Sequence, residues 1–298
     1  MKQGEDKMSE QSLENNLLVS ELKKMNIIPT SIEFIRNKDG VHTYGVSENE
    51  KHYFFKYFEK LEFRREITNY KTLRDLYIPT ISLVGFTDSS LLLEDINYSK
   101  YRLCTEEDLQ NTLIIKLISK WYKKLHINGL NYSHKNDLYS ELDLFSRENL
   151  KFLLDNNDIE QIPILEVIYK KYEFFRNHIN SLETTLTYND FHYSNIAIAR
   201  DMSLVIIFDY NLLGRGCITS DISNVLWQLK DNELKRIFLD EYGEIKQSER
   251  AIIDIVNPII SLFIAYQKIK FPSWGNQLIE TLSSDNYYKM VNDFLSNT

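Results

Sequence analysis

Short apolar runs separated by turn residues dominate the first third of the chain and predict antiparallel strands. Residues 31–60, "SIEFIRNKDGVHTYGVSENEKHYFFKYFEK", are expected to form two or three strands. Residues 62–77, "EFRREITNYKTLRDLY", instead carry an apolar stripe at helical spacing that runs from Phe63 to Tyr77. Two more strands are expected in "ISLVGF" and "SLLLEDI". This region therefore reads as a sheet with one amphipathic helix.

The pattern becomes helical shortly after residue 100. The segment "EEDLQNTLIIKLISKWYKKLHI" predicts a long helix with Thr105 as its N-cap, and further helices follow to the end of the chain. One predicted hairpin, built from "IAIAR" and "LVIIF", interrupts them. The order predicts an α+β fold in two lobes, a β-rich lobe over residues 1–97 and a mainly helical lobe over residues 98–298.

Polar side chains bracket this hairpin. If its turn is centred on residue 202, Asn195 and Asp209 lie opposite each other, with Cβ atoms roughly 5 Å apart. A carboxylate and an amide oxygen at that separation suit Mg²⁺, and Asp190 precedes them on a loop. Asp and Asn also commonly end strands and cap turns, so each residue alone is equally compatible with a structural role.

A charged residue stands on an apolar face in each of two neighbouring elements. In "HYFFKYF" (52–58), strand alternation places Lys56 on the face of two phenylalanines, and Glu66 lies inside the apolar stripe of the following helix. An ion pair between them would satisfy both charges. Glu62 is an alternative partner, and a Lys56 that extends to solvent at a sheet edge is the structural alternative.

Composition excludes several classes of protein. The 298 residues carry a net charge of −8 and contain two cysteines, which argues against nonspecific nucleic-acid binding, a disulfide framework and a cysteine-based metal cluster. The first 16 residues lack the apolar core of a secretion signal, and no run approaches the about 18 apolar residues of a membrane span. We therefore expect a cytoplasmic protein that binds neither nucleic acid nor membrane.

The hairpin and its flanks resemble the aminoglycoside phosphotransferase and choline kinase family, which has a two-lobed protein-kinase-like fold. The family motif H-G-D-x-H-x-x-N, followed by a hairpin and an I-D-F/W segment, reads here as "YNDFHYSN", the hairpin and "FDYNLLGRGCITSDIS". The resemblance implies that Asp190 orients the acceptor hydroxyl as the catalytic base. It implies that Asn195 and Asp209 bind magnesium, and that Asp221 braces the catalytic loop.

The same resemblance assigns roles in the first third. Lys56, held by Glu66, is expected to contact the nucleotide phosphates. Backbone groups of Glu94 to Ile96, in the segment that joins the lobes, are expected to bind adenine. The turn at Asp39 and Gly40 is expected to cover the phosphates with its backbone amides.

Two parts of the motif depart from the family pattern. Tyr188-Asn189 replaces the usual His-Gly, and Tyr210-Asn211 replaces Phe-Gly. Asn can take the left-handed backbone conformation that Gly otherwise supplies. His126 matches a helix-end histidine of the family and is interpreted as structural.

The predicted function is transfer of the γ-phosphate of ATP or GTP, with Mg²⁺, to a hydroxyl of a small molecule such as an aminoglycoside, a choline-like compound or another amine. The acidic segment 231–249 would suit a cationic acceptor, although a solvated helix face explains it equally well. The alternative is a nucleotide-binding pseudokinase with a scaffold or sensor role. A protein kinase is disfavoured, because no activation segment with an A-P-E-like end follows Asp209.

Overall fold

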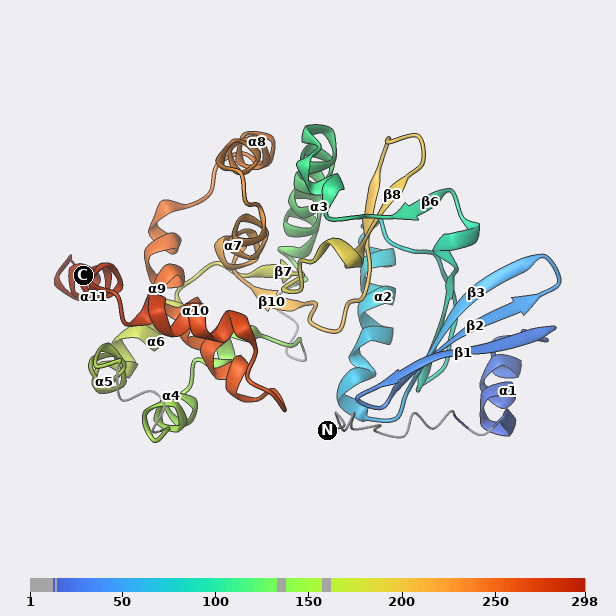
Figure 1. The fold of residues 1–298 in the computed structure, drawn as a ribbon, viewed down its shortest axis with the longest axis horizontal. Helices are drawn as coiled ribbons and strands as arrows, with labels where there is room; N and C mark the ends of the chain where they lie inside the picture. Colours follow the sequence, from blue (N-terminus) through green and yellow to red (C-terminus); the bar gives the residue numbers. More distant parts are fainter. Residues whose placement is uncertain (1–12, 14, 133–137, 157–161, 298) are drawn as a thin grey trace, which may run out of the picture. The chain divides into compact units, whose positions relative to one another are not determined.

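The computed structural model describes residues 13, 15–132, 138–156 and 162–297. The chain divides into two compact units, of which the first contains Met1–Trp121 and His192–Asn211 and the second Tyr122–Phe191 and Leu212–Thr298. The α+β class is confirmed, with the strands of the large sheet early in the chain and helices prevailing later (Figure 1). The lobe limits 1–97 and 98–298 remain a prediction.

The first unit is built on an antiparallel five-stranded sheet of order β1-β2-β3-β5-β4. The expected strands are all present, as β1 (Ser31–Lys38), β2 (Val41–Glu48), β3 (Lys51–Phe58), β4 (Leu83–Phe86) and β5 (Ser90–Glu94). Asp39 and Gly40 join β1 to β2 with φ values of 57° and 86°. Two consecutive left-handed residues form the tight hairpin turn for which Asp-Gly is the preferred sequence.

Helices cover this sheet. Helix α1 (Asn15–Lys24) packs Leu18 and Leu22 into an apolar cluster with Tyr44 of β2 and Phe55 of β3. Helix α2 (Arg65–Asp75) follows β3 after a short 3-10 turn (Leu61–Phe63). Figure 1 shows α1 and α2 on opposite sides of the sheet.

The end of α2 corrects the predicted apolar stripe. Tyr77 lies beyond the helix at φ 56° and is 81% exposed, so it is not part of the buried face. The N–H of Ile78 bonds to the carbonyl of Leu73, and the N–H of Tyr77 bonds to the carbonyl of Arg74. This pattern ends a helix with a left-handed residue and turns the next side chain, here the buried Ile78, back toward the helix.

A second sheet in the first unit contains the predicted hairpin. Its order is β6-β8-β9, formed by β6 (Tyr101–Leu103), β8 (Ile196–Ala199) and β9 (Val205–Ile207). Strand β6 was not predicted from the sequence. The hairpin therefore pairs with a segment that precedes it by almost a hundred residues, and this pairing places its ends in the first unit.

The long helix starts later than predicted. Helix α3 (Thr112–Gly129) begins after a separate 3-10 turn (Glu107–Gln110), so Thr105 is not its N-cap. The carboxylate of Asp108 binds the Arg102 guanidinium at 2.6 and 2.8 Å and accepts the Thr105 N–H, which closes that turn on itself. Asn111 then caps the helix, because its Oδ1 accepts the N–H of Leu113 at 2.9 Å.

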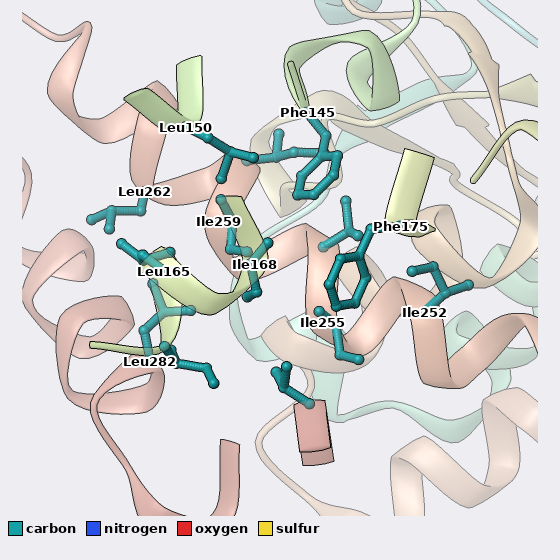
Figure 2. Close-up of a cluster of buried hydrophobic side chains, with 14 of the residues drawn as sticks. Phe145, Leu150, Leu165, Ile168, Phe175, Ile252, Ile255, Ile259, Leu262 and Leu282 are labelled. Atoms are coloured by element: carbon teal, nitrogen blue, oxygen red, sulfur yellow. The ribbon is translucent and has the colours of Figure 1, made fainter. Parts of the chain in front are cut away.

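The second unit is mainly helical around α9 (Gln247–Tyr266). Its core gathers aliphatic and aromatic side chains from α9 and from the helices packed on it (Figure 2). The other helices are α4 (Arg147–Leu154), α5 (Ile164–Lys170), α6 (Tyr172–Asn180), α7 (Ile218–Gln228), α8 (Asn232–Tyr242), α10 (Ser273–Leu282) and α11 (Asp285–Asn297). Strands β7 (Thr185–Thr187) and β10 (Gly214–Gly216) form a small antiparallel sheet. Within the described ranges, no helix has the length and apolar character that crossing a membrane requires.

Candidate functional site

The hairpin register differs by one residue from the prediction. Ile196 pairs with Ile207 and Ile198 with Val205, and the N–H of Phe208 bonds to the carbonyl of Asn195 at 3.0 Å. Asn195 therefore lies opposite Phe208, not opposite Asp209. The cause is the turn, because residues 200–203 form a four-residue loop in which Met202 is left-handed at φ 60°. A turn centred on residue 202 would have needed an odd number of loop residues.

The backbone at Asp209 departs from strand geometry. Its φ of 64° is left-handed, so the alternation of β9 no longer decides where its side chain points. Its Oδ1 accepts from Lys56 Nζ at 3.0 Å and from Asn211 Nδ2 at 3.1 Å, and the side chain remains 27% exposed. The convergence of Asn195 and Asp209 on one metal ion remains a prediction.

The predicted ion pair between Lys56 and Glu66 is confirmed. Lys56 Nζ lies 2.8 Å from Glu66 Oε1, and their side chains are 9% and 0% exposed. Glu62, the alternative partner, lies in the exposed 3-10 turn before α2. Burial alone would lower the pKa of Lys56, but attraction to Glu66 and Asp209 outweighs it and raises that pKa. The lysine is therefore a fixed cation.

The Asp209 carboxylate is held in its charged form. Burial would raise its pKa, but the cations of Lys56, Arg36 and Lys38 together lower it. An ionised, partly exposed oxygen ligand suits Mg²⁺, which needs one or two protein oxygens and takes the rest from water and phosphate. Among the described residues, no group of three or more His, Cys, Asp or Glu side chains could hold a metal ion. A metal here would therefore depend on Asp209, an amide such as Asn195, and the phosphates.

Helix α2 also holds the two residues after Asp209. The Asn69 side chain donates to the carbonyl of Tyr210 at 2.7 Å, and Arg65 Nε donates to the carbonyl of Asn211 at 2.5 Å. The ring of Tyr210 is fully buried, and its hydroxyl lies 2.8 Å from Thr80 Oγ1. A phenylalanine, usual at this position of the motif, could not make this hydrogen bond. Asn211 is not left-handed; Asp209 takes that conformation instead.

Asp221 fixes the backbone of the predicted catalytic loop in the second unit. It lies in the first turn of α7 and is fully buried. Its Oδ2 accepts the N–H of Tyr188 at 2.8 Å, and its Oδ1 accepts the N–H of Asn189 at 2.9 Å. His126 Nε2 lies 3.0 Å from the same carboxylate, while His126 Nδ1 lies 2.8 Å from the Tyr242 hydroxyl. These contacts agree with the bracing and structural roles inferred for Asp221 and His126.

Asn189 occupies the place of the usual glycine without disturbing the loop. Its φ is 63°, which is the left-handed conformation expected of an Asn at that place. Its side chain adds a hydrogen bond from Nδ2 to the carbonyl of Leu212 at 2.9 Å. Asp190 follows directly and is half-buried. The departures at Tyr188 and Asn189 are thus compatible with an ordered loop.

Sequence reasoning missed Glu141, a carboxylate close to Asp190 and Asp221. Burial, followed by repulsion from those two carboxylates, raises the pKa of Glu141 to about 7. Glu141 lies in a 3-10 turn (Glu141–Leu144), far from the loop in sequence, so no motif spacing could have signalled it. The only clue was its position within an acidic and apolar stretch, "SELDLF".

The remaining candidates lie in the first unit. Glu94 ends β5, and its carboxylate accepts from Ser82 Oγ at 2.8 Å, so its side chain is engaged within the sheet. Ile96 begins the next 3-10 turn (Ile96–Tyr98), and within the described part of the chain its N–H has no acceptor. A free N–H there fits the expectation that backbone groups of this segment bind adenine.

Comparisons with known proteins place this fold. No family model matches the chain, and no curated protein matches it. Among solved structures, the choline kinase LicA from Streptococcus pneumoniae superposes with a TM-score of 0.60 and 15% identity, covering 90% of this chain and 96% of that chain. A choline kinase from Cryptosporidium parvum Iowa II reaches 0.62 with 14% identity, covering 95% and 97%. The spectinomycin phosphotransferase APH(9)-Ia reaches 0.60 with 15% identity, covering 94% of each chain.

These three solved structures are all small-molecule kinases by name, and each likeness extends over nearly the whole chain. The sheet-rich beginning and the helical remainder match the architecture that the sequence resemblance implied. The chain therefore has the kinase-like fold of the aminoglycoside phosphotransferase and choline kinase family.

Proposed function

We propose that this protein is a phosphotransferase that moves the γ-phosphate of ATP or GTP to a hydroxyl group of a small molecule, with Mg²⁺ as cofactor. The observation that carries the proposal is the buried contact of Lys56 with both Glu66 and Asp209. A buried lysine between two carboxylates has no evident packing value, since buried ion pairs rarely add stability over apolar residues. Such a lysine does have a clear use in phosphoryl transfer, where a fixed cation binds the phosphates of the nucleotide.

On the nucleotide side, we assign the magnesium ion to Asp209 and Asn195 and the phosphates to Lys56. When bound, magnesium supplies positive charge to the phosphate oxygens as the transferring group develops negative charge. We assign adenine to the backbone of Glu94 to Ile96. Structures of LicA with AMP and of APH(9)-Ia with ADP and spectinomycin support a nucleotide as donor.

On the acceptor side, we assign Asp190 the role of orienting the hydroxyl and receiving its proton. Asp221 acts through the loop, because it holds the two N–H groups that precede Asp190. An amine-bearing acceptor is favoured by the carboxyl groups of Asp190 and Glu141 in this part of the second unit, because a bound cation would stabilise the ionised form of Glu141 against the raised pKa. The names of the related kinases, which act on choline, ethanolamine and spectinomycin, point the same way.

The acidic segment 231–249 adds little to this argument. On α8, Arg236 pairs with Asp240 at 3.1 Å and with Glu233 at 3.8 Å, and these side chains are largely exposed. They form the ordinary charged face of a surface helix. The acceptor class therefore rests on the surroundings of Asp190.

The test is nucleotide turnover with ATP or GTP against a panel of choline, ethanolamine and aminoglycosides, with and without Mg²⁺. With an accepted substrate, Asp190→Ala is expected to lower kcat by about 10²–10⁴-fold while leaving the affinity for the Mg²⁺–nucleotide complex unchanged. Asp201→Ala, in the exposed hairpin loop, is the control and should behave as wild type. Full activity of Asp190→Ala would overturn the assignment. Metal-dependent nucleotide binding without turnover of any acceptor would favour the pseudokinase alternative.

A further inference from the structure

Strand β1 contains a bulge that reassigns the side chains of its second half. Phe34 pairs with Tyr44 of β2, but the next pair joins Arg36 to Thr43, so Ile35 is an extra residue in the ladder. The pairing then continues regularly to Lys38 and Val41. A bulge of this kind shifts the alternation of the strand by one residue.

The shift places Arg36 and Lys38 on the face of the sheet that carries Lys56. Phe34 and Tyr44 belong to the apolar cluster under α1, so their neighbours Arg36 and Thr43 face the other side. Thr43 also pairs with Lys56 across β2 and β3. Strict alternation without the bulge would have put Arg36 and Lys38 on the α1 face, with Phe34. The bulge therefore collects three cations on one face of the sheet.

Unlike Lys56, the two cations of β1 are not already satisfied by protein anions. Across the described residues, neither the Arg36 guanidinium nor the Lys38 ammonium has an ion-pair or hydrogen-bond partner, and both residues are exposed. They share a face of the sheet with Lys56, whose ammonium lies 3.0 Å from the Asp209 carboxylate. Unpaired positive charge thus lies on the same sheet face as the lysine that contacts the proposed metal ligand.

The backbone of the adjacent turn is not equally available. The N–H of Gly40 bonds to Asn37 Oδ1 at 3.2 Å, and the carbonyl of Gly40 accepts the N–H of Glu59 at 3.0 Å. A turn whose glycine N–H is already bonded offers less to a phosphate than a glycine-rich loop with free amides. The cationic side chains next to the turn are the stronger candidates for the same task.

We propose that Arg36 and Lys38 bind the terminal phosphates of the donor nucleotide and replace the backbone amides of a glycine-rich loop. This inference rests on the proposed function, because it needs a nucleotide triphosphate at the site. Guanidinium and ammonium groups bind phosphate through charge-assisted hydrogen bonds, with Arg able to contact two oxygens at once. The contacts belong to the β- and γ-phosphates, because Arg36 and Lys38 lie on the sheet face of Lys56, whose ammonium contacts the carboxylate assigned to the metal.

The competing explanation is that β1 is an edge strand protected from aggregation by surface charge. That explanation predicts no effect on nucleotide binding. Glu33, which pairs with Gly45 on the same face, and Lys51, which pairs with Glu48 at the start of β3 on the opposite face, provide controls. Both are exposed, so their substitution should leave the fold intact.

The experiment measures the Kd of ATP, ADP and AMP, each with Mg²⁺, for the full chain and the variants Arg36→Gln, Lys38→Gln and Lys51→Gln. Each of the first two is expected to weaken ATP by about 10-fold and to leave AMP unchanged, because AMP lacks the terminal phosphates. The salt dependence of ATP binding should also become less steep. Lys51→Gln should match wild type, and Glu33→Gln should bind ATP as well as wild type or better.

Two outcomes would overturn the inference and leave the proposed function intact. In the first, Arg36→Gln and Lys38→Gln lose ATP and AMP affinity equally. In the second, they bind ATP as tightly as Lys51→Gln does. Absence of any ATP or GTP binding by the wild-type protein would instead overturn the proposed function and this inference together. Unfolding temperatures of all variants, measured without nucleotide, separate lost binding from lost structure.

Discussion

Lys56 Nζ lies 3.0 Å from the carboxylate of Asp209, although the two residues are 153 positions apart in the sequence. The same ammonium lies 2.8 Å from Glu66, so one lysine satisfies two carboxylates. This contact connects β3, the central strand of the large sheet, to Asp209, which follows β9 of the hairpin. Both residues belong to the first unit.

Removing this lysine should be costly. Lys56→Met leaves Glu66 fully buried without its cation, so the free energy of unfolding is expected to fall by about 3–5 kcal/mol. The double variant Lys56→Met with Glu66→Gln should recover part of the loss, because the fully buried charge of Glu66 is then removed and only the partly exposed Asp209 lacks its cation. Urea denaturation measures both values. Glu62→Gln, in the exposed turn before α2, is the control, and an equal loss there would contradict the explanation.

The hydroxyl of Tyr210 gives a second prediction. Tyr210→Phe restores the residue usual in the family but removes the hydrogen bond to Thr80 and leaves buried acceptors with fewer donors. We expect a loss of about 1–2 kcal/mol in unfolding free energy with nucleotide affinity largely retained. Tyr77→Phe removes an exposed hydroxyl and should change neither quantity. If Tyr210→Phe kept the wild-type unfolding free energy but lost its affinity for nucleotide, the hydroxyl would serve nucleotide binding instead.

Asp221 is expected to stabilise the predicted catalytic loop more than it stabilises its own helix, α7. In Asp221→Asn, one of the two oxygens becomes an NH₂ group that faces a backbone N–H or the His126 ring. We expect a loss of about 1–3 kcal/mol in unfolding free energy and a lower kcat with an accepted substrate. Asp231→Asn is the matched control, since Asp231 caps α8 at the surface, where Asn serves nearly as well. Equal kcat for both variants would remove the bracing role.

Glu141 predicts a dependence of stability on pH. Its pKa rises from the usual 4.5 to about 7, so the folded protein binds a proton there that the unfolded chain releases. Its contribution to stability is therefore fully present below pH 4.5 and is lost as the pH rises to about 7, a change of roughly 3 kcal/mol at most.

This dependence can be measured by urea denaturation at pH 5 and pH 8. Glu141→Gln should show a smaller decrease between these values than wild type does. Glu166→Gln, which alters an exposed carboxylate on α5, should keep the wild-type decrease. A Glu141→Gln protein with the full decrease would assign the pH dependence to other groups.

The strongest sequence signals were charges in apolar patterns. Lys56 and Glu66 were paired from strand alternation and a helical stripe, and the structure joins them directly. The five strands of the large sheet followed from short apolar runs bounded by turn residues. These features depend on local periodicity, which a single sequence carries well.

Features that depend on a one-residue change in strand register could not be predicted from the sequence. The hairpin loop has four residues, a length that the turn composition does not reveal, so Asn195 was assigned the wrong cross-strand neighbour. Thr105 resembles an N-cap in sequence, but its N–H bonds to the Asp108 carboxylate in a separate turn, and α3 begins only at Thr112. The bulge at Ile35 was equally hidden, because alternation alone assigns Arg36 to the wrong face of β1.

Short elements held by distant partners were also missed. Strands β6, β7 and β10 have three residues each, too few for any period to appear. β6 exists because β8 pairs with it, and β7 because β10 does. Glu141 belongs with them, since only the folded chain brings it toward Asp190.

The insertion of Tyr122–Phe191 between the parts of the first unit has a consequence for biosynthesis. During translation, β6 and Lys56 leave the ribosome long before β8 and Asp209, the partners that complete their contacts. Until residue 211 has been made, β6 therefore has no strand partner, and Lys56 has Glu66 but not Asp209 as a carboxylate partner. Contacts between segments so distant in sequence form slowly. A ribosome that stalls before the hairpin would thus release a chain that cannot finish its first unit.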